Sequence, residues 1–164
     1  MLTFLVLAGC GQTSAGKLND EQKKERIQSM YESYKEKSFP DAPGLTAQDY
    51  LKLNEEEKII LIDVREKKEM EVSVIPGAIT RDEFEDNKDK YRDYKVVSYC
   101  TIGYRSGKYT RKLVKEKFDA YNLVGGVLSW AHAGQKFAAP DGDSLQVHVY
   151  GDDWDLLPVG YKSV

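Results

Sequence analysis

The sequence predicts an α/β domain with a mainly parallel central sheet and helices on both faces. Residues 58–64 form a nearly continuous apolar run, as expected of a parallel strand covered on both sides. Shorter runs of β-type residues follow at 96–99 and 120–124. Helical patterns separate these runs, and strands that alternate with helices favour a mainly parallel sheet.

Helices are expected on either side of each strand. The predicted segments are residues 46–54, 66–72, 82–88 and 106–118. The first begins at Thr46, a residue type that caps helices, and has Asp49 in its first turn. The last places Leu113 and Phe118 on one face, where they can reach the core.

The regions outside this alternating pattern divide the chain into four parts. Residues 1–10 resemble a lipoprotein signal, and 11–40 read as a polar tether followed by an amphipathic helix. Residues 41–138 contain the domain, and 139–164 form an extension whose apolar and aromatic residues should fold back onto it. A chain of 164 residues is long enough for one domain with an extension at each end.

The amino-terminal residues end in Leu-Ala-Gly-Cys, a tetrad that resembles a bacterial lipobox. In that motif the chain is cut before the cysteine, here Cys10, and the cysteine is lipidated. The apolar run is too short to span a bilayer as a helix and lacks a positive leading segment. The expectation is a protein of the cell envelope, held on the extracytoplasmic face of a membrane by lipid on Cys10.

Composition restricts the remaining classes of function. The net charge is −3 with both signs interspersed, which gives no indication of nucleic-acid binding. The acidic residues at 152, 153 and 155 lack the glycine and terminal glutamate of a calcium loop. We expect no metal site and no cofactor. With Cys10 lipidated, Cys100 would be the one remaining thiol, so no disulfide could form within the chain.

The segment from Cys100 to Arg105 carries the chemistry. Cys100 follows a β-branched run and precedes the predicted helix, so it lies beyond a strand's carboxyl end, where ligands bind such sheets. Free N–H groups at a helix start favour a thiolate and can hold an anion. Four residues separate Cys100 from Arg105. Cysteine phosphatases have five in this loop, so the shorter loop suits a group smaller than phosphate.

This loop and three further segments resemble rhodanese domains, which are sulfurtransferases. The matching segments are Ile-Ile-Leu-Ile-Asp-Val-Arg-Glu at 59–66, Ile-Pro-Gly-Ala-Ile at 75–79, and Tyr-Asn-Leu-Val-Gly-Gly-Val-Leu-Ser-Trp at 121–130. The four occur in the family's order across residues 45–135. One difference is Val74, because the family often has histidine at that position.

The resemblance implies covalent sulfur transfer through Cys100. The thiolate would take the outer sulfur of a small anionic donor such as thiosulfate, and a thiol or cyanide would then remove it. The loop residues Thr101, Ile102, Gly103, Tyr104, Arg105 and Ser106 would bind the substrate and the persulfide. Arg105 is expected to bind the anionic donor or, alternatively, to brace the loop through a carboxylate. Asp63 and Arg65 are expected to form a salt bridge beneath the site.

Two other classes remain open at this stage. One is a non-catalytic rhodanese-like module tethered to a membrane, which binds a partner or carries sulfur; the presence of Cys100 argues against it. The other is a phosphatase or arsenate reductase of the same fold, against which the loop length argues. The sequence does not indicate an oligomeric state.

Overall fold

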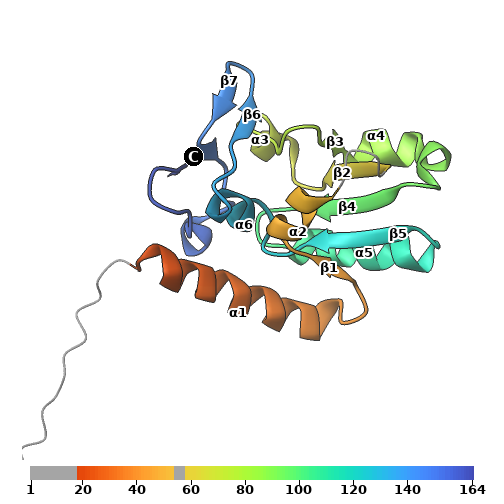
Figure 1. The fold of residues 1–164 in the computed structure, drawn as a ribbon, viewed down its shortest axis with the longest axis horizontal. Helices are drawn as coiled ribbons and strands as arrows, with labels where there is room; N and C mark the ends of the chain where they lie inside the picture. Colours follow the sequence, from red (N-terminus) through yellow and green to blue (C-terminus); the bar gives the residue numbers. More distant parts are fainter. Residues whose placement is uncertain (1–17, 54–57) are drawn as a thin grey trace, which may run out of the picture.

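Five strands form the central sheet of the computed structural model, which describes residues 18–53 and 58–164 (Figure 1). Their order across the sheet is β1-β5-β4-β2-β3, and every neighbouring pair is parallel. The strands are β1 (Gly44–Leu45), β2 (Ile59–Asp63), β3 (Ile79–Thr80), β4 (Lys95–Tyr99) and β5 (Asp119–Leu123). The predicted parallel α/β sheet is confirmed.

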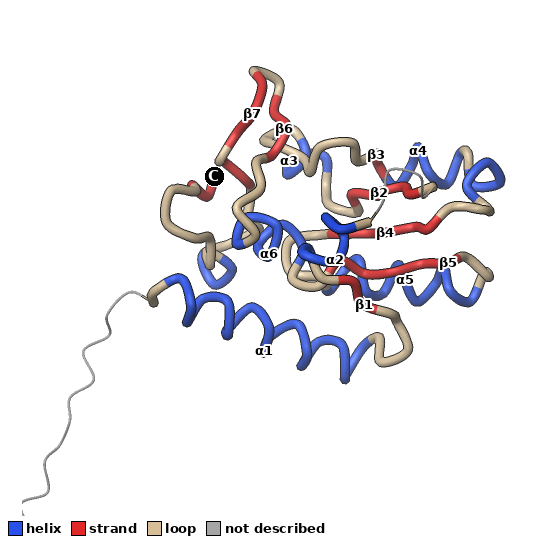
Figure 2. Tube along the Cα trace, viewed as in Figure 1, coloured by secondary structure: helices blue, strands red, loops and turns tan. Residues whose placement is uncertain are grey.

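Helices cover both faces of the sheet, as the sequence predicts (Figure 2). They are α2 (Ala47–Lys52), α3 (Lys67–Met70), α4 (Arg81–Asp86), α5 (Tyr104–Lys115) and α6 (Gly126–His132), with a 3₁₀ turn η1 (Lys88–Tyr91). Successive strand residues point to opposite faces. Leu61 and Val97 therefore pack in one buried cluster with α6, while Ile62 and Val96 pack in another with α4 and α5.

The helix that follows Cys100 begins and ends earlier than the predicted 106–118. α5 begins at Tyr104 and ends at Lys115. Two residues later Lys117 adopts a left-handed backbone with φ of 68°, and the Phe118 N–H turns back to the carbonyl of Leu113 at 3.0 Å. This reversal closes the helix and sends Phe118 into the core beneath it.

α1 (Asp20–Ser38) precedes the domain and packs along α5 and α6 (Figure 1). The Asn19 side chain accepts a hydrogen bond from the Gln22 backbone N–H, and the Gln22 side chain accepts one from the Asn19 backbone N–H, which satisfies two free donors at the helix start. Ile27 and Tyr31 are buried on the inner face. The apolar spacing in this segment therefore reflects packing against the domain.

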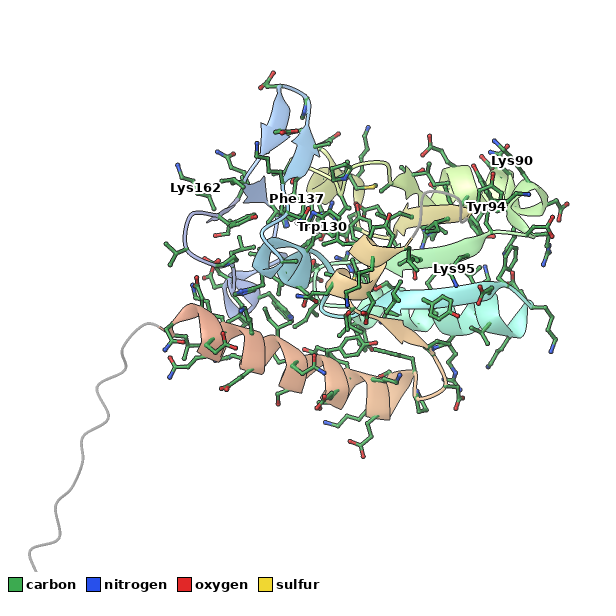
Figure 3. The ribbon with its side chains drawn as sticks, viewed as in Figure 1. Lys90, Tyr94, Lys95, Trp130, Phe137 and Lys162 are labelled. Carbon is green, nitrogen blue, oxygen red and sulfur yellow. The ribbon has the colours of Figure 1, made fainter. Side chains whose placement is uncertain are left out.

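The carboxyl-terminal extension lies against the same side of the domain. It contains a hairpin of β6 (Phe137–Ala139) and β7 (Gly142–Ser144), a short parallel pair of β8 (Gln146–Val147) and β9 (Lys162–Ser163), and a 3₁₀ turn η2 (Asp152–Trp154). Val147 and Leu156 are buried in the cluster that contains Trp130 and Phe137 (Figure 3). Lys23 of α1 donates to the Leu157 carbonyl at 2.7 Å, so α1 and the extension are joined.

Glu85 of α4 connects that helix to α5. Its carboxylate accepts hydrogen bonds from Tyr109 at 2.8 Å, Lys88 at 2.8 Å and Lys112 at 3.0 Å. Burial alone would raise the pKa of Glu85, but these three donors lower it to about 2. The carboxylate therefore stabilises the fold fully above its ordinary pKa of 4.5, and this contribution is lost as the pH falls toward 2.

Replacing Glu85 by glutamine should lower the free energy of unfolding by about 1 kcal/mol near neutral pH, since the carboxylate is partly exposed and screened. Urea unfolding of Glu85→Gln and of the unchanged protein, at about pH 7 and about pH 3, checks this. The difference between the two proteins should narrow at the lower pH. A difference that stays constant would show that the charge of Glu85 does not contribute.

Candidate active site

Cys100 lies directly after β4, at the carboxyl end of the central strands. The residue is 1% exposed, so the nucleophile is enclosed by the loop that it begins. The backbone N–H of Gly103 donates to Cys100 Sγ at 3.2 Å, and the Ser106 hydroxyl lies 3.5 Å from the same atom. Two donors from the start of α5 thus face the sulfur, where they would stabilise negative charge.

Gly103 allows the loop to make this turn. Its φ is 98°, a left-handed conformation that residues with a Cβ rarely adopt. A Cβ at this position would also lie 2.8 Å from the ring of Tyr31, which packs under the loop from α1. Both the backbone angle and the close approach of Tyr31 therefore favour glycine at the residue whose N–H reaches the sulfur.

The other side of the loop is held by the first turn of α6. The N–H of Val127 donates to the carbonyl of Cys100 at 3.0 Å, and that of Leu128 to the carbonyl of Thr101 at 3.3 Å. Gly126 permits this contact, because a Cβ there would lie 2.0 Å from the Cys100 carbonyl oxygen. The Gly-Gly segment thus supports the loop that begins at Cys100.

Arg105 is bound to a buried carboxylate on α3. Its two terminal nitrogens donate to Glu69, at 2.6 Å to Oε2 and 2.7 Å to Oε1, and Thr101 Oγ1 also donates to Glu69 at 3.2 Å. Of the two roles expected for Arg105, the structure shows the brace through a carboxylate. Binding of the anionic donor, the other role expected of Arg105, stays a prediction.

Glu69 and Arg105 each help to keep the other ionised. Burial alone would raise the pKa of Glu69, but hydrogen bonds from Arg105 and from the Glu66 backbone give a net lowering. Burial would lower the pKa of Arg105, but Glu69 and the nearby Cys100 sulfur raise it. Both groups therefore stay ionised, and their opposite charges cancel beside the loop.

A second buried ion pair lies beneath the sheet end, as expected for Asp63 and Arg65. The Arg65 and Asp63 side chains are 2.7 Å apart, and both are essentially inaccessible to water. Tyr99 donates to Asp63 at 2.6 Å, and Arg65 also reaches the carbonyl of Ser73 at 2.6 Å. The pair joins β2, β4 and the segment before β3 without touching the sulfur.

A pocket of about 310 Å³ opens beside the nucleophile. Cys100, Thr101, Ile102 and Arg105 of the loop form its floor, and four aromatic residues, Tyr34, Tyr104, Tyr150 and Trp154, form its walls. Tyr34 comes from α1, and the last two come from the carboxyl-terminal extension. The lining is mainly apolar.

The pocket contains some of the site residues that the sequence predicts and others that it does not. Cys100, Thr101, Ile102, Tyr104 and Arg105 line it, while Gly103 and Ser106 lie behind the sulfur. Glu69, Tyr34, Tyr150 and Trp154 are additional. The helical spacing of apolar residues in the sequence places Tyr34 on one face of a helix, and the carboxyl-terminal extension is rich in aromatic residues. Neither pattern indicates that these residues lie near Cys100.

Cys10, the cysteine expected to carry lipid, falls outside the described residues. Within residues 18–53 and 58–164, no helix is long and apolar enough to cross a membrane. No group of three or more His, Cys, Asp or Glu side chains suited to a metal occurs in those same ranges.

Comparison with known proteins assigns the family. The model of the Rhodanese-like domain matches residues 46–133, which is more than half of the chain. This chain belongs to the rhodanese-like domain family. The match lies inside residues 41–138, assigned to the domain by sequence, and contains both the Cys100 loop and the supporting turn of α6.

Curated relatives carry the rhodanese-like part within longer proteins. A tRNA uridine(34) hydroxylase of Onion yellows phytoplasma is 31% identical over 129 residues, covering 72% of this chain and 41% of the relative. A protein of the same name from Enterococcus faecalis is 28% identical, covering 60% and 39%. The chain thus spans less than half the length of these relatives.

Solved structures support the fold. A thiosulfate sulfurtransferase from Pseudomonas aeruginosa aligns with a TM-score of 0.53 and 18% identity, over 69% of this chain and 23% of that one. A protein of unknown function from Rhodopseudomonas palustris, described as a possible tyrosine phosphatase, aligns at 0.51 and 20%, over 77% and 99%. At these identities the likeness concerns the rhodanese-like architecture alone.

Proposed function

We propose that this rhodanese-like protein is a sulfurtransferase that carries sulfane sulfur as a persulfide on Cys100. The observation that carries the proposal is the surroundings of the sulfur. The Gly103 N–H and the Ser106 hydroxyl both face Cys100 Sγ, and a pocket gives a substrate access to it. Membership of the rhodanese-like family supports the same chemistry.

The transfer has two steps, each with balanced electrons. The Cys100 thiolate attacks the terminal sulfur of the donor, so the new S–S bond forms on Sγ. The bond between that sulfur and the rest of the donor breaks, and its electron pair leaves with the remainder, which is sulfite when thiosulfate is the donor. A thiolate or cyanide then attacks the outer sulfur and releases the Cys100 thiolate.

The loop supplies what the persulfide requires. Negative charge moves from Sγ to the added sulfur, close to the Gly103 N–H and the Ser106 hydroxyl. These donors are already oriented, since α6 holds the loop carbonyls and Glu69 holds Arg105. Pre-oriented donors stabilise developing charge without having to reorganise during the reaction. A lone thiol is sufficient, because no resolving cysteine takes part.

Loading with inorganic polysulfide tests this function directly. We expect a mass gain of one sulfur atom, located on the peptide that contains Cys100, and release of that sulfur as thiocyanate when cyanide is added. A Cys100→Ser sample provides the background. Absence of the added sulfur in the folded protein would overturn the proposal. Loading without onward transfer would instead favour the sulfur-carrying module considered from the sequence.

The hydroxylase relatives do not change this proposal. Their name refers to uridine in tRNA, and the part that matches this chain is 42% or less of their length. The phosphatase alternative is disfavoured by the four-residue spacing between Cys100 and Arg105.

The proposal includes a location in the cell envelope. It rests on the Leu-Ala-Gly-Cys tetrad that ends at Cys10, followed by a polar tether. Lipid on that cysteine would hold the domain at the extracytoplasmic face of a membrane. Small sulfur donors and thiols present outside the cytoplasm would then be its substrates.

A further inference from the structure

The pocket beside Cys100 differs in character from a site for an inorganic anion. Four aromatic rings stand around the sulfur, in two contacting pairs. The rings of Tyr34 and Tyr104 have centroids 5.2 Å apart, and those of Tyr150 and Trp154 are 5.6 Å apart. A volume of about 310 Å³ falls at the lower end of the range for pockets that hold organic ligands.

The charge around the pocket also disfavours a dianion. Arg105 is the one charged residue among those that line it, and Glu69 compensates its charge. The nearby Lys108 is exposed to water, with its ammonium 5.3 Å from the Tyr104 ring centroid. The exposed carboxylates of Asp152 and Asp153 precede Trp154 in the same turn. Among the described residues that line the pocket, thiosulfate would thus find backbone and hydroxyl donors and a single cation, Arg105, whose charge Glu69 already compensates.

Tyr150 is held over the pocket in a conformation that its backbone would not choose freely. Its φ is 73°, in the left-handed region that favours glycine. Its N–H donates to His148 Nδ1 at 3.0 Å, and its ring lies 5.2 Å from the Arg105 guanidinium. A ring maintained in such a position, and still 54% exposed, is available to stack on a ligand.

We infer that the sulfur donor is an organic sulfane-sulfur monoanion with an aromatic or other apolar group, rather than thiosulfate. This inference rests on the proposed function and specifies its substrate class. The apolar group would lie among Tyr34, Tyr150 and Trp154, and the terminal sulfur would point to Cys100. Hydropersulfides and thiosulfonates of this type place one negative charge at the sulfur end and apolar surface at the other.

The transfer from such a donor is balanced. With a thiosulfonate, the Cys100 thiolate bonds to the terminal sulfur, and the bond from that sulfur to the sulfonyl sulfur breaks. The electron pair leaves with the sulfinate, and the enzyme persulfide retains one negative charge. With a hydropersulfide, the departing group is the parent thiolate. Neither reaction requires an oxidant, a reductant or a metal.

Three donors that share one reaction separate the effects of charge and of the aromatic group. Thiosulfate is a dianion, methanethiosulfonate is a monoanion with a small apolar group, and benzenethiosulfonate is a monoanion with a ring. All three give the same enzyme persulfide, so kcat/KM measured for the donor with cyanide as acceptor reports only the loading step. We expect benzenethiosulfonate to exceed thiosulfate by about tenfold or more, with methanethiosulfonate between them.

Variants of the aromatic wall assign the preference to the pocket. In Trp154→Ala and Tyr150→Ala, the ratio of kcat/KM for benzenethiosulfonate over that for thiosulfate should fall toward that of methanethiosulfonate. Trp154→Phe and Tyr150→Phe keep a ring and should restore most of the ratio. Leu145→Ala changes an exposed apolar residue of the same extension outside the pocket and should leave the ratio unchanged. Thermal unfolding of each variant excludes loss of the fold.

The outcomes distinguish the inference from the function on which it rests. Polysulfide loading of Cys100 together with a preference for thiosulfate would overturn the inference and leave the sulfurtransferase intact. A ring preference that survives both alanine variants would also overturn it, because the preference would then reflect donor reactivity. Failure of every donor, polysulfide included, would remove the proposed function and the inference with it.

Discussion

Replacing Cys100 by serine should reduce sulfur transfer by at least about a thousandfold while the domain stays folded. The serine hydroxyl is a far weaker nucleophile near neutral pH than a thiolate, and an oxygen cannot carry the persulfide. The loop geometry should survive, because Gly103 and the first turn of α6 fix its backbone independently of the sulfur.

Thiocyanate formation, with each of the donors above, measures the loss, and urea unfolding measures the fold. We expect the free energy of unfolding to change by about 1 kcal/mol or less, since the hydroxyl can still accept from the Gly103 N–H. Transfer that persisted in Cys100→Ser would place the nucleophile elsewhere. A variant that failed to fold would leave Cys100→Ala, which introduces no new hydroxyl, as the test of the same claim.

Replacing Glu69 by glutamine should have the largest effect on stability. The Glu69 side chain is fully buried, and its partner Arg105 would retain its charge without the carboxylate that pairs with it. Removing one partner of a buried pair costs several kcal/mol. Because glutamine keeps an acceptor and Arg105 is partly exposed, we expect a loss of about 2 to 3 kcal/mol in the free energy of unfolding.

The pH dependence identifies the origin of that loss. The pKa of Glu69 in the folded protein lies below its ordinary value of 4.5, so the carboxylate contributes fully above that pH. The contribution disappears as the pH falls through the lower, folded pKa. The stability difference between the unchanged protein and Glu69→Gln should therefore be constant near neutral pH and shrink below about pH 4.

We expect Glu69 to act on the proposed reaction through Arg105, as a positioning residue. With its charge uncompensated, Arg105 should attract dianions more strongly, and the use of thiosulfate relative to benzenethiosulfonate should rise. A role confined to packing would lower both rates together and leave that ratio unchanged. Glu71→Gln is the matched control, because Glu71 is 63% exposed and pairs only loosely, at 3.7 Å, with Lys67.

The sequence predicts those elements whose pattern and structure both depend on a few neighbouring residues. The apolar run of β2, the helix cap at Thr46 and the loop from Cys100 to Arg105 each lie within a few residues, and each is found in the structure. Strands β1 and β3 are two residues long, too short for any alternation to show. They become strands because their neighbours in the sheet pair with them.

The unforeseen parts of the site depend on contacts between distant segments. Glu69 reaches Arg105 across 36 positions of the chain, and an acidic residue in a short helix carries no local sign of burial. The sequence offered a carboxylate brace for Arg105 as an alternative, but it could not identify Glu69 as that carboxylate. Tyr150 and Trp154 meet Tyr34 at the pocket only because both ends of the chain fold onto the same side of the sheet.

The origin of the pocket walls has a consequence for how members of this family diverge. Tyr34, Tyr150 and Trp154 lie outside residues 46–133, whereas the nucleophile and its donors lie within them. In the proposed function, the residues for the reaction and those for the choice of donor therefore lie in separate stretches of the sequence. Exchange of the flanking segments could redirect the enzyme to another donor while every residue that bonds or polarises sulfur stays the same.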